Sequence, residues 1–172
     1  GNALIAAGKF TEAETAYGRA AALEPDTGAV FFLRLADAYL KAGETERAET
    51  AARRCLASRP DEPLYHCTLG DILVRRGRLE EARGCYDAAV ALRPEDAGAY
   101  YNRLGNALTR DGRHRQALEA FRAAVAAAPD TPALYERLAA ACRALGLDEQ
   151  AHDAELRDGV NKKGPRGNLA GR

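Results

Sequence analysis

The sequence predicts an all-α fold, a solenoid of stacked antiparallel helix hairpins. Two observations predict it. Residue types recur every 34 or 35 residues along most of the 172-residue chain, which is the mark of a stacked repeat architecture. The composition also favours helices, because Ala, the strongest helix former, is abundant while only 6% of the residues are aromatic. A sheet sandwich, which needs many β-branched and aromatic residues, is therefore excluded.

The repeat is defined by four columns of identical residues that stay in phase. Glycine steps by 35, 34, 35 and 34 residues, alanine follows it with the same steps, and leucine lies eight residues before glycine in four of the units. The columns are Gly8, Gly43, Gly77, Gly112 and Gly146; Ala13, Ala48, Ala82, Ala117 and Ala151; Pro25, Pro60, Pro94 and Pro129; and Leu35, Leu69, Leu104 and Leu138. Each period is therefore one structural unit.

Each unit contains two helical segments. Over residues 64–74 the core positions fall three or four residues apart, which predicts a helix, and Gly77 then breaks it. A second helix is predicted over residues 79–92, with one stripe of small and aromatic residues, and it ends before Pro94. The order of each unit is therefore helix, glycine turn, antiparallel helix and proline stop.

Polar residues and proline mark the helix starts. Thr11 and Glu14 have the spacing of a capping box, in which each side chain bonds a backbone N–H at the helix start. Asp61-Glu62-Pro63 and Asp130-Thr131-Pro132 place polar caps before proline, which is favoured at the first helical position.

These columns resemble the tetratricopeptide repeat family, whose pattern is an aromatic residue, Leu-Gly or Leu-Ala, a bulky residue, Gly, Ala, an aromatic residue, Ala and Pro within about 34 residues. The unit that fits best has Tyr101, Leu104, Gly105, Leu108, Gly112, Ala117, Phe121, Ala124 and Pro129. The resemblance implies a right-handed superhelix with a concave groove lined by the first helix of each repeat. The 34- and 35-residue steps also resemble pentatricopeptide repeats, which read RNA, but the basic character and motif of that family are absent.

The resemblance covers residues 1–158. The chain enters the pattern partway through a first helix, giving a partial repeat over 1–27, followed by repeats over 28–62, 63–97 and 98–131 and a terminal repeat over 132–158. In the terminal repeat Glu155 and Asp158 replace an aromatic residue and Ala, which predicts a capping unit with one face in water. Residues 159–172, with several glycines and a proline, are predicted to form a flexible tail or linker.

The candidate binding residues lie on the side of each first helix opposite the core stripe, and the resemblance implies that this side is concave. Its charged residues are seven basic against three acidic, which predicts a basic groove on a chain whose net charge is zero. The candidate groove residues are Arg34, Asp37, Lys41, Asp71, Arg75, Asn102, Arg103, Asn106, Arg110, Arg137 and Arg143, together with Glu136 as the third acid.

The predicted function is a protein-interaction scaffold. The partner is expected to be a protein or peptide segment, acidic or carrying a free C-terminal carboxylate, because Arg binds carboxylates with two parallel hydrogen bonds and Asn bonds peptide backbones. The alternative is that these arginines only solvate an Ala-rich helix. Asn106 and Arg137 resemble two members of the family's chaperone-tail clamp, although a Lys of that clamp is missing.

Two further functions stay open from the sequence. Residues 101–108 resemble repeats of sugar-transferring enzymes that carry Asn ladders, so the array is alternatively a substrate-recruiting module of a larger glycosyltransferase or sulfotransferase. A self-assembly module is the other alternative, with the incomplete first repeat stacking on a neighbouring copy.

No enzyme, cofactor or metal site is expected. His66, His114 and His152 lie at packing or surface positions without metal spacing, and no phosphate loop or nucleophile motif occurs. Cys67 falls on the predicted groove face near Arg34 and Arg75, which leaves open an activated thiol.

No nucleic acid or membrane partner is expected either. Basic and acidic residues balance at 25 each, and no stretch approaches the about 20 apolar residues that span a bilayer. Four scattered cysteines without a Cys-x-x-Cys pair predict reduced thiols and a cytoplasmic chain, although the start within a repeat leaves an upstream targeting segment open.

Overall fold

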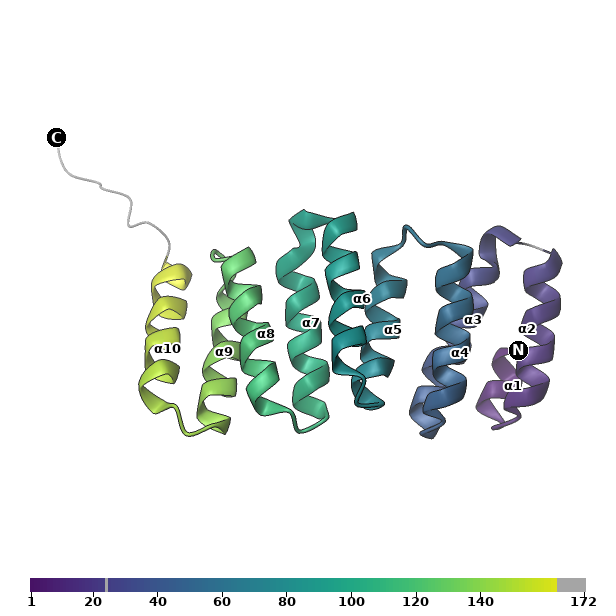
Figure 1. Cartoon of the computed structure of the whole chain (residues 1–172), viewed down its shortest axis with the longest axis horizontal. Coiled ribbons are helices and arrows are strands. Elements are labelled where there is room, and N and C mark those ends of the chain that lie inside the picture. The colour runs from purple at the N-terminus through teal and green to yellow at the C-terminus, as the bar shows by residue number, and fades with distance from the viewer. Residues whose placement is uncertain (24, 164–172) are drawn as a thin grey trace. The chain divides into compact units, whose positions relative to one another are not determined.

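The computed structural model describes the backbone of residues 1–23 and 25–163 and the side chains of residues 1–23 and 28–158. Every regular element in this part of the chain is helical, which confirms the predicted fold class (Figure 1). The elements are α1 Asn2–Ala6, α2 Phe10–Leu23, α3 Pro25–Ala42, α4 Thr45–Ser58, α5 Pro63–Arg75, α6 Leu79–Leu92, the 3-10 helix η1 Pro94–Asp96, α7 Ala97–Arg110, α8 His114–Ala127, α9 Pro132–Ala144 and α10 Asp148–Lys163.

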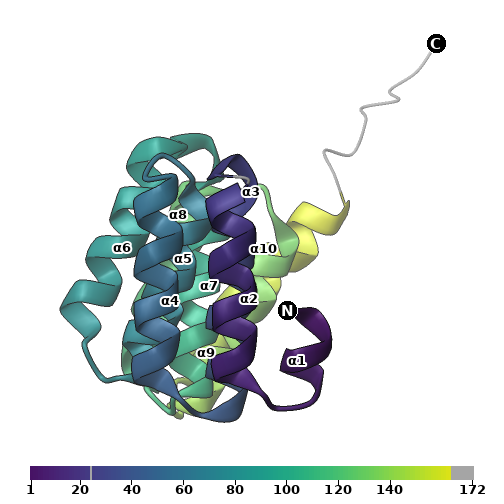
Figure 2. The same ribbon diagram turned by 90° about the vertical axis from the view of Figure 1, so that its right-hand side faces the viewer.

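The chain divides into two compact units after Pro94. The first unit contains the hairpins α1–α2, α3–α4 and α5–α6, and Figure 2 shows α1 as a short helix beside one end of α2. The second unit contains the hairpins α7–α8 and α9–α10. Within each unit, the second helix of one hairpin also packs against the first helix of the next, as α4 does on α5 and α8 on α9. Each unit is therefore a stack of helix hairpins, as the repeat predicts.

The glycine column forms the turn inside each hairpin. Gly77 has φ +73°, a left-handed conformation that costs other residues energy because their Cβ crowds the backbone. The N–H of Gly77 donates to the carbonyl of Val74 at 2.9 Å, and that of Arg78 donates to Leu73 at 2.9 Å. These two bonds close the end of α5 in the manner of a Schellman motif. The other four glycines of the column also have positive φ, so the column is confirmed as the hairpin turn.

The cores of the hairpins use the small residues of the repeat. Ala82 is fully buried, and a Cβ added to Gly70 of α5 would lie 2.7 Å from the ring of Tyr86 on α6. Gly105 of α7 is related to Phe121 of α8 in the same way, at 2.6 Å. The first helix must therefore be small where the second carries an aromatic ring, because the ring fills the space of a side chain.

The helix starts differ from the predicted caps. Glu62 and Thr131 stand at the N-cap positions of α5 and α9, each followed by proline. The Glu62 carboxylate accepts from Leu64 N–H at 3.4 Å, whereas the Thr131 side chain forms no capping hydrogen bond in the described structure. The capping box at Thr11 is wrong, because α2 begins at Phe10 and the carbonyl of Lys9 accepts from Ala13 at 3.0 Å. The glycine turn runs into the second helix within two residues, which places Lys9 and not Thr11 at the cap.

The structure refines two predicted boundaries. Pro25 follows the end of α2 at Leu23 and is itself the first residue of α3, since proline suits the first helical turn, where its missing N–H has no partner to lose. Helix α10 continues to Lys163, so the tail predicted from residue 159 starts five residues too early. Residues 164–172 of that tail lie outside the described residues.

Candidate partner-binding site

In the first unit, three predicted groove residues line one pocket together with Asn2. Asn2 of α1 and Arg34, Asp37 and Lys41 of α3 surround a volume of about 290 Å³, which we call the α1–α3 pocket. Arg34 Nη1 donates to Asn2 Oδ1 at 2.9 Å, and Lys41 Nζ lies 2.6 Å from Asp37 Oδ2. Lys41 and Asp37 stand four residues apart on one helix face, so their charges cancel and Arg34 provides the net positive charge of this pocket.

The two charged candidates of α5 are engaged elsewhere. The Tyr86 hydroxyl donates to Asp71 Oδ1 at 2.5 Å, and Arg75 Nη1 donates to the carbonyl of Leu40 at 3.3 Å. Neither residue lines the α1–α3 pocket. Cys67, which the sequence placed on an open groove face, is only 1% exposed, so the idea of an accessible, activated thiol there is wrong.

In the second unit, Asn106 of α7 and Arg137 of α9 line a smaller pocket of about 120 Å³, the α7–α9 pocket. Alanines, among them Ala140 and Ala144, form part of the wall, beside Phe121 and Thr109. Among the described residues neither the Asn106 amide nor the Arg137 guanidinium has a hydrogen-bond or ionic partner within the chain. Two donor groups from successive first helices therefore meet at a cavity and remain available to a ligand.

His114, which the sequence predicts at a packing or surface position, also lines the α7–α9 pocket. It is the first residue of α8 and follows the turn at Gly112, which ends the helix that carries Asn106. Because the two helices of a hairpin are antiparallel, a residue directly after the glycine turn lies beside the end of the first helix. The position of His114 in the sequence therefore indicates that it lies near the C-terminal end of α7.

The other candidates of the second unit lie outside the α7–α9 pocket. Arg110 is exposed and its Nε donates to the carbonyl of Asn106 at 3.3 Å, while Arg143 forms an ion pair with Glu155 of α10. The Oδ1 atom of Asn102 is buried and has no hydrogen-bond partner, and Arg103 is half-buried. The predicted cap residue Glu155 thus neutralises one groove arginine, which sequence columns alone could not reveal.

The basic surplus is unevenly divided between the units. On the first unit the candidates are three cations and two carboxylates, with one pair closed between Lys41 and Asp37. On the second unit they are four arginines against Glu136, with Arg143 neutralised by Glu155. The excess of positive charge is therefore greater among the candidate residues of the second unit.

Two of the buried thiols are held in their protonated form. Burial raises the pKa of the Cys55 thiol to about 12, and burial also raises the pKa of Cys142. A high pKa keeps a thiol protonated and unreactive. No group of three or more His, Cys, Asp or Glu residues that could hold a metal ion occurs among the described residues.

None of the helices described is both long and apolar enough to cross a bilayer.

The fold is shared with solved structures of low sequence identity. A crystal structure of MamA is 19% identical, with 93% of this chain and 92% of that chain covered and a TM-score of 0.62. A second crystal structure of MamA is 18% identical, covers 99% and 92%, and has a TM-score of 0.63. MamA from residue 41 onward, from Desulfovibrio magneticus RS-1, is 18% identical with a TM-score of 0.54, covering 92% and 98%. At these identities the likeness concerns the fold.

Comparison with known sequences and family models addresses the family as well as the fold. A comparison with curated protein sequences gives no match. Two sequence models described as tetratricopeptide repeat match residues 1–63, 33–97 and 98–141. The matched segments contain every glycine turn except Gly146 and all four hairpins before α9–α10 in whole or part. The chain therefore belongs to the tetratricopeptide repeat family.

Proposed function

We propose that this chain is a non-catalytic protein-interaction scaffold and that the second unit holds an acidic partner segment or a free C-terminal carboxylate at the α7–α9 pocket. One observation carries this proposal: Asn106 and Arg137, on successive first helices, line the same pocket and have no partner among the described residues. A charged group that lines a cavity without an internal partner is free to bind a ligand of opposite charge.

The chemistry of the pocket favours a carboxylate. The Arg137 guanidinium presents a planar fork of N–H donors that matches two carboxylate oxygens, and the Asn106 amide adds a further donor. The alanines of the wall allow a peptide backbone to approach closely. A volume of about 120 Å³ accommodates a carboxylate group and little more, so the rest of the segment would extend along the helix surface.

The first unit supplies a weaker site of the same kind. In the α1–α3 pocket the described hydrogen bond of Arg34 is to the neutral Asn2 side chain, whereas Lys41 is already paired with Asp37. We expect this pocket to contribute one cationic contact to an acidic segment. Surface contacts of this type are weak and are screened by salt.

The direct test uses a synthetic pentapeptide, acetyl-Gly-Ser-Glu-Asp-Glu with a free C-terminus, and its amidated Gln and Asn analogue. We expect the wild-type chain to bind the acidic peptide and not the amidated analogue. The affinity for the acidic peptide should fall at least tenfold in the Arg137→Glu variant. For the wild type, it should also be lower at about 500 mM than at about 50 mM salt. Arg115→Glu on α8 is the matched control, because Arg115 is exposed and lines none of the pockets described. Equal affinity of the two peptides, or equal loss in the two variants, would contradict the proposal.

Self-association is a second candidate, favoured by apolar side chains on the first unit. Leu23, at the end of α2, is 83% exposed and Val30 of α3 is 41% exposed. Exposed large apolar side chains can take part in contact surfaces between copies of a chain. Sedimentation of the wild type and of Leu23→Ser over a range of concentrations tests this candidate. A wild type that remains monomeric at the highest concentration would remove it.

The proposal places the chain in a reducing, cytoplasmic setting. Cys55, Cys67 and Cys142 are buried, and none of the four cysteines forms a disulfide in the described structure. Titration of free thiols in the protein purified from its native source tests this placement, since a secreted chain would contain oxidised cysteine.

A further inference from the structure

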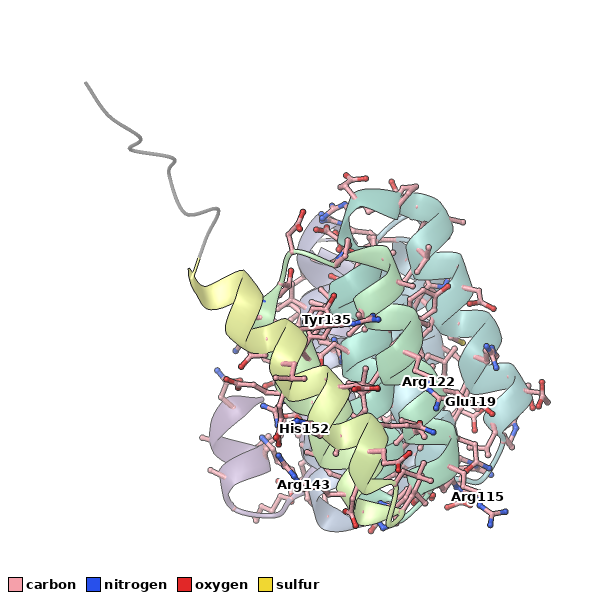
Figure 3. All side chains as sticks on the ribbon, turned by 90° about the vertical axis from the view of Figure 1, so that its left-hand side faces the viewer. Arg115, Glu119, Arg122, Tyr135, Arg143 and His152 are labelled. Atoms are coloured by element: carbon pink, nitrogen blue, oxygen red, sulfur yellow. The ribbon has the colours of Figure 1, made fainter. Side chains whose placement is uncertain are left out.

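A larger pocket lies on the second unit between α8 and α10. Its volume is about 390 Å³, and its floor is formed by Tyr135, Leu138 and Cys142 of α9. Figure 3 shows the second unit from the side of α10, with Arg122 of α8 and Tyr135 labelled. We call it the α8–α10 pocket. Its volume lies within the range of about 300–1,000 Å³ that is usual for ligand sites.

The α8–α10 pocket and the α7–α9 pocket use opposite faces of α9. Residues of an α-helix advance by about 100° each, so positions 135, 138 and 142 point in nearly one direction and 137, 140 and 144 point away from it. The first set lines the α8–α10 pocket and the second lines the α7–α9 pocket. A ligand in one pocket therefore leaves the other accessible.

The leucine that contributes to this floor is partly exposed, whereas its counterparts in the earlier hairpins are buried. Leu138 belongs to the leucine column, whose earlier members Leu35, Leu69 and Leu104 are 1%, 3% and 7% exposed. Leu138 is partly exposed and contributes to the pocket wall together with Val125. An apolar surface that the repeat buries elsewhere is thus available to a ligand at this position.

The walls carry two cationic groups that form no ion pair with any described residue. Arg122 Nη2 donates to the neutral Gln150 amide at 2.7 Å, and Arg157 has no ionic partner among the described residues. Arg122 also lies near enough to Cys142 to lower its thiol pKa, although burial raises that pKa overall. Asp153 is the single acid in the lining, so the two arginines leave a net positive charge.

The floor offers one polar group as well. The Tyr135 side chain is only 6% exposed, and within the part of the chain that the structure describes its hydroxyl has no hydrogen-bond partner. The hydroxyl oxygen is not among the buried polar atoms that lack a partner, so it reaches the solvent of the pocket, where it can donate to a ligand. The pocket thus combines an apolar floor, an available donor and two cations on opposite walls.

We infer that the α8–α10 pocket binds an acidic peptide segment that inserts one aromatic or large aliphatic side chain onto Leu138 and Tyr135 and places flanking carboxylates on Arg122 and Arg157. Charge complementarity and the placement of one arginine on each side of the apolar floor support this occupant. The site lies beyond the proposed groove function and does not depend on it.

The test uses the capped peptide acetyl-Gly-Asp-Phe-Asp-Gly-amide, whose only carboxylates are its two Asp side chains, and the Arg137→Glu variant reports any binding of these at the α7–α9 pocket. Amide signals of the full-length ¹⁵N-labelled chain are followed by NMR as the peptide is added. We expect saturable shifts at residues of α8 and α10 that line the pocket, and affinity at least tenfold lower for the double variant Arg122→Glu, Arg157→Glu. Ala126→Glu, at an exposed lining residue, is expected to weaken binding similarly while leaving the spectrum of the free protein folded.

Matched controls separate this site from the groove. Arg115→Glu changes the charge of α8 outside the pocket, and Arg137→Glu removes the groove arginine, so both are expected to bind the capped peptide within twofold of the wild type. Peptides with Asn for Asp or Ser for Phe are expected to bind at least tenfold more weakly.

Four results would overturn the inference. The first is the absence of saturable shifts, and the second is shifts centred on Asn106 and Arg137. The third is equal binding of the Asn peptide. The fourth is another occupant that binds the pocket more tightly than the peptide does. That occupant would be either a free small anion, tested as 3-phenylpropionate, or a second copy of the chain, seen as shifts on dilution.

Discussion

Arg78 donates from Nη1 to both carboxylate oxygens of Glu49, at 2.8 Å each, and so ties the turn after α5 to helix α4. Glu49 is 8% exposed and also accepts from Arg53 Nε at 2.8 Å, while Arg76 Nε lies 3.1 Å from its second oxygen. Three arginines from two hairpins therefore surround one buried acid.

Replacing Glu49 by Gln should destabilise the first unit by about 2 kcal/mol, because charge-assisted hydrogen bonds are lost and the arginines face no carboxylate. Urea unfolding at neutral pH measures this difference. Glu46→Gln is the control, since Glu46 also pairs with Arg76, at 3.2 Å, but its side chain is 77% exposed. That variant should change stability by less than about 0.5 kcal/mol. Similar losses in both variants would show that burial does not strengthen the Glu49 contacts.

The same carboxylate should make the first unit sensitive to acid. Burial raises the pKa of Glu49, but the hydrogen bonds and charges of Arg53 and Arg78 together lower it by more. The folded pKa therefore lies below the ordinary value of 4.5. A lowered folded pKa stabilises the fold above the unfolded pKa and loses this contribution as the pH falls through the folded pKa. The stability gap between wild type and Glu49→Gln should thus be constant from neutral pH to about 5 and narrow below about 4.5. Unfolding measured at a series of pH values checks this, and a gap that widens in acid would refute it.

Adding a methyl group at Gly105 should force the ring of Phe121 to move. The added Cβ would lie 2.6 Å from that ring, and overpacking of this kind costs about 1–3 kcal/mol. In a Phe121→Ala background the same change should become stabilising by up to about 1 kcal/mol, because Ala favours a helix more than Gly does. A double-mutant cycle in urea unfolding measures the change of sign. Additive effects would show that the two positions are not in contact.

The conformations of two glycines in one hairpin predict opposite responses to alanine. Gly77→Ala should destabilise the chain by about 1 kcal/mol, since residue 77 has φ +73°. Gly84→Ala should stabilise it by about 0.5–1 kcal/mol, because Gly84 lies inside α6 and no heavy atom stands within 4 Å of the new Cβ. Thermal unfolding of both variants compares them. Destabilisation by Gly84→Ala would mean that α6 needs the freedom of glycine there.

Thiol reagents should distinguish the four cysteines. Cys85 is partly exposed, whereas Cys55, Cys67 and Cys142 are buried. We expect one thiol to react in the native protein and four in urea. The native reaction should be slow near neutral pH, because burial raises the pKa of Cys85. Cys85→Ser is expected to abolish the native reaction. Rapid labelling of that variant would contradict the burial of the other three.

The sequence predicts the hairpins well because each is specified locally. The predicted helix over residues 79–92 coincides with α6, and the glycine column coincides with the positive-φ turns. The caps were less predictable, because the turn geometry places Lys9 at the start of α2 although Thr11 is the better capping residue by type.

The candidate site could be predicted only in part. Helical periodicity identifies a face, and in this way it found Asn106 and Arg137. It does not tell how closely neighbouring helices cover that face, so Cys67 was placed on an open surface. Periodicity also does not show which ionic partners a residue meets across helices, and the pairing of Arg143 with Glu155 therefore came only from the structure. The α8–α10 pocket was missed because Leu138 fits the buried leucine column by type.

The location of the Glu49 cluster limits how repeats of this chain can be exchanged. The Gly105–Phe121 contact lies within a single hairpin and travels with it when the hairpin is moved. Glu49 belongs to the α3–α4 hairpin, but Arg76 and Arg78 come from the next one. Recombination between these two hairpins would leave a buried acid with Arg53 alone. Shuffled or consensus arrays built from this chain should therefore keep α3 to α6 together as one block.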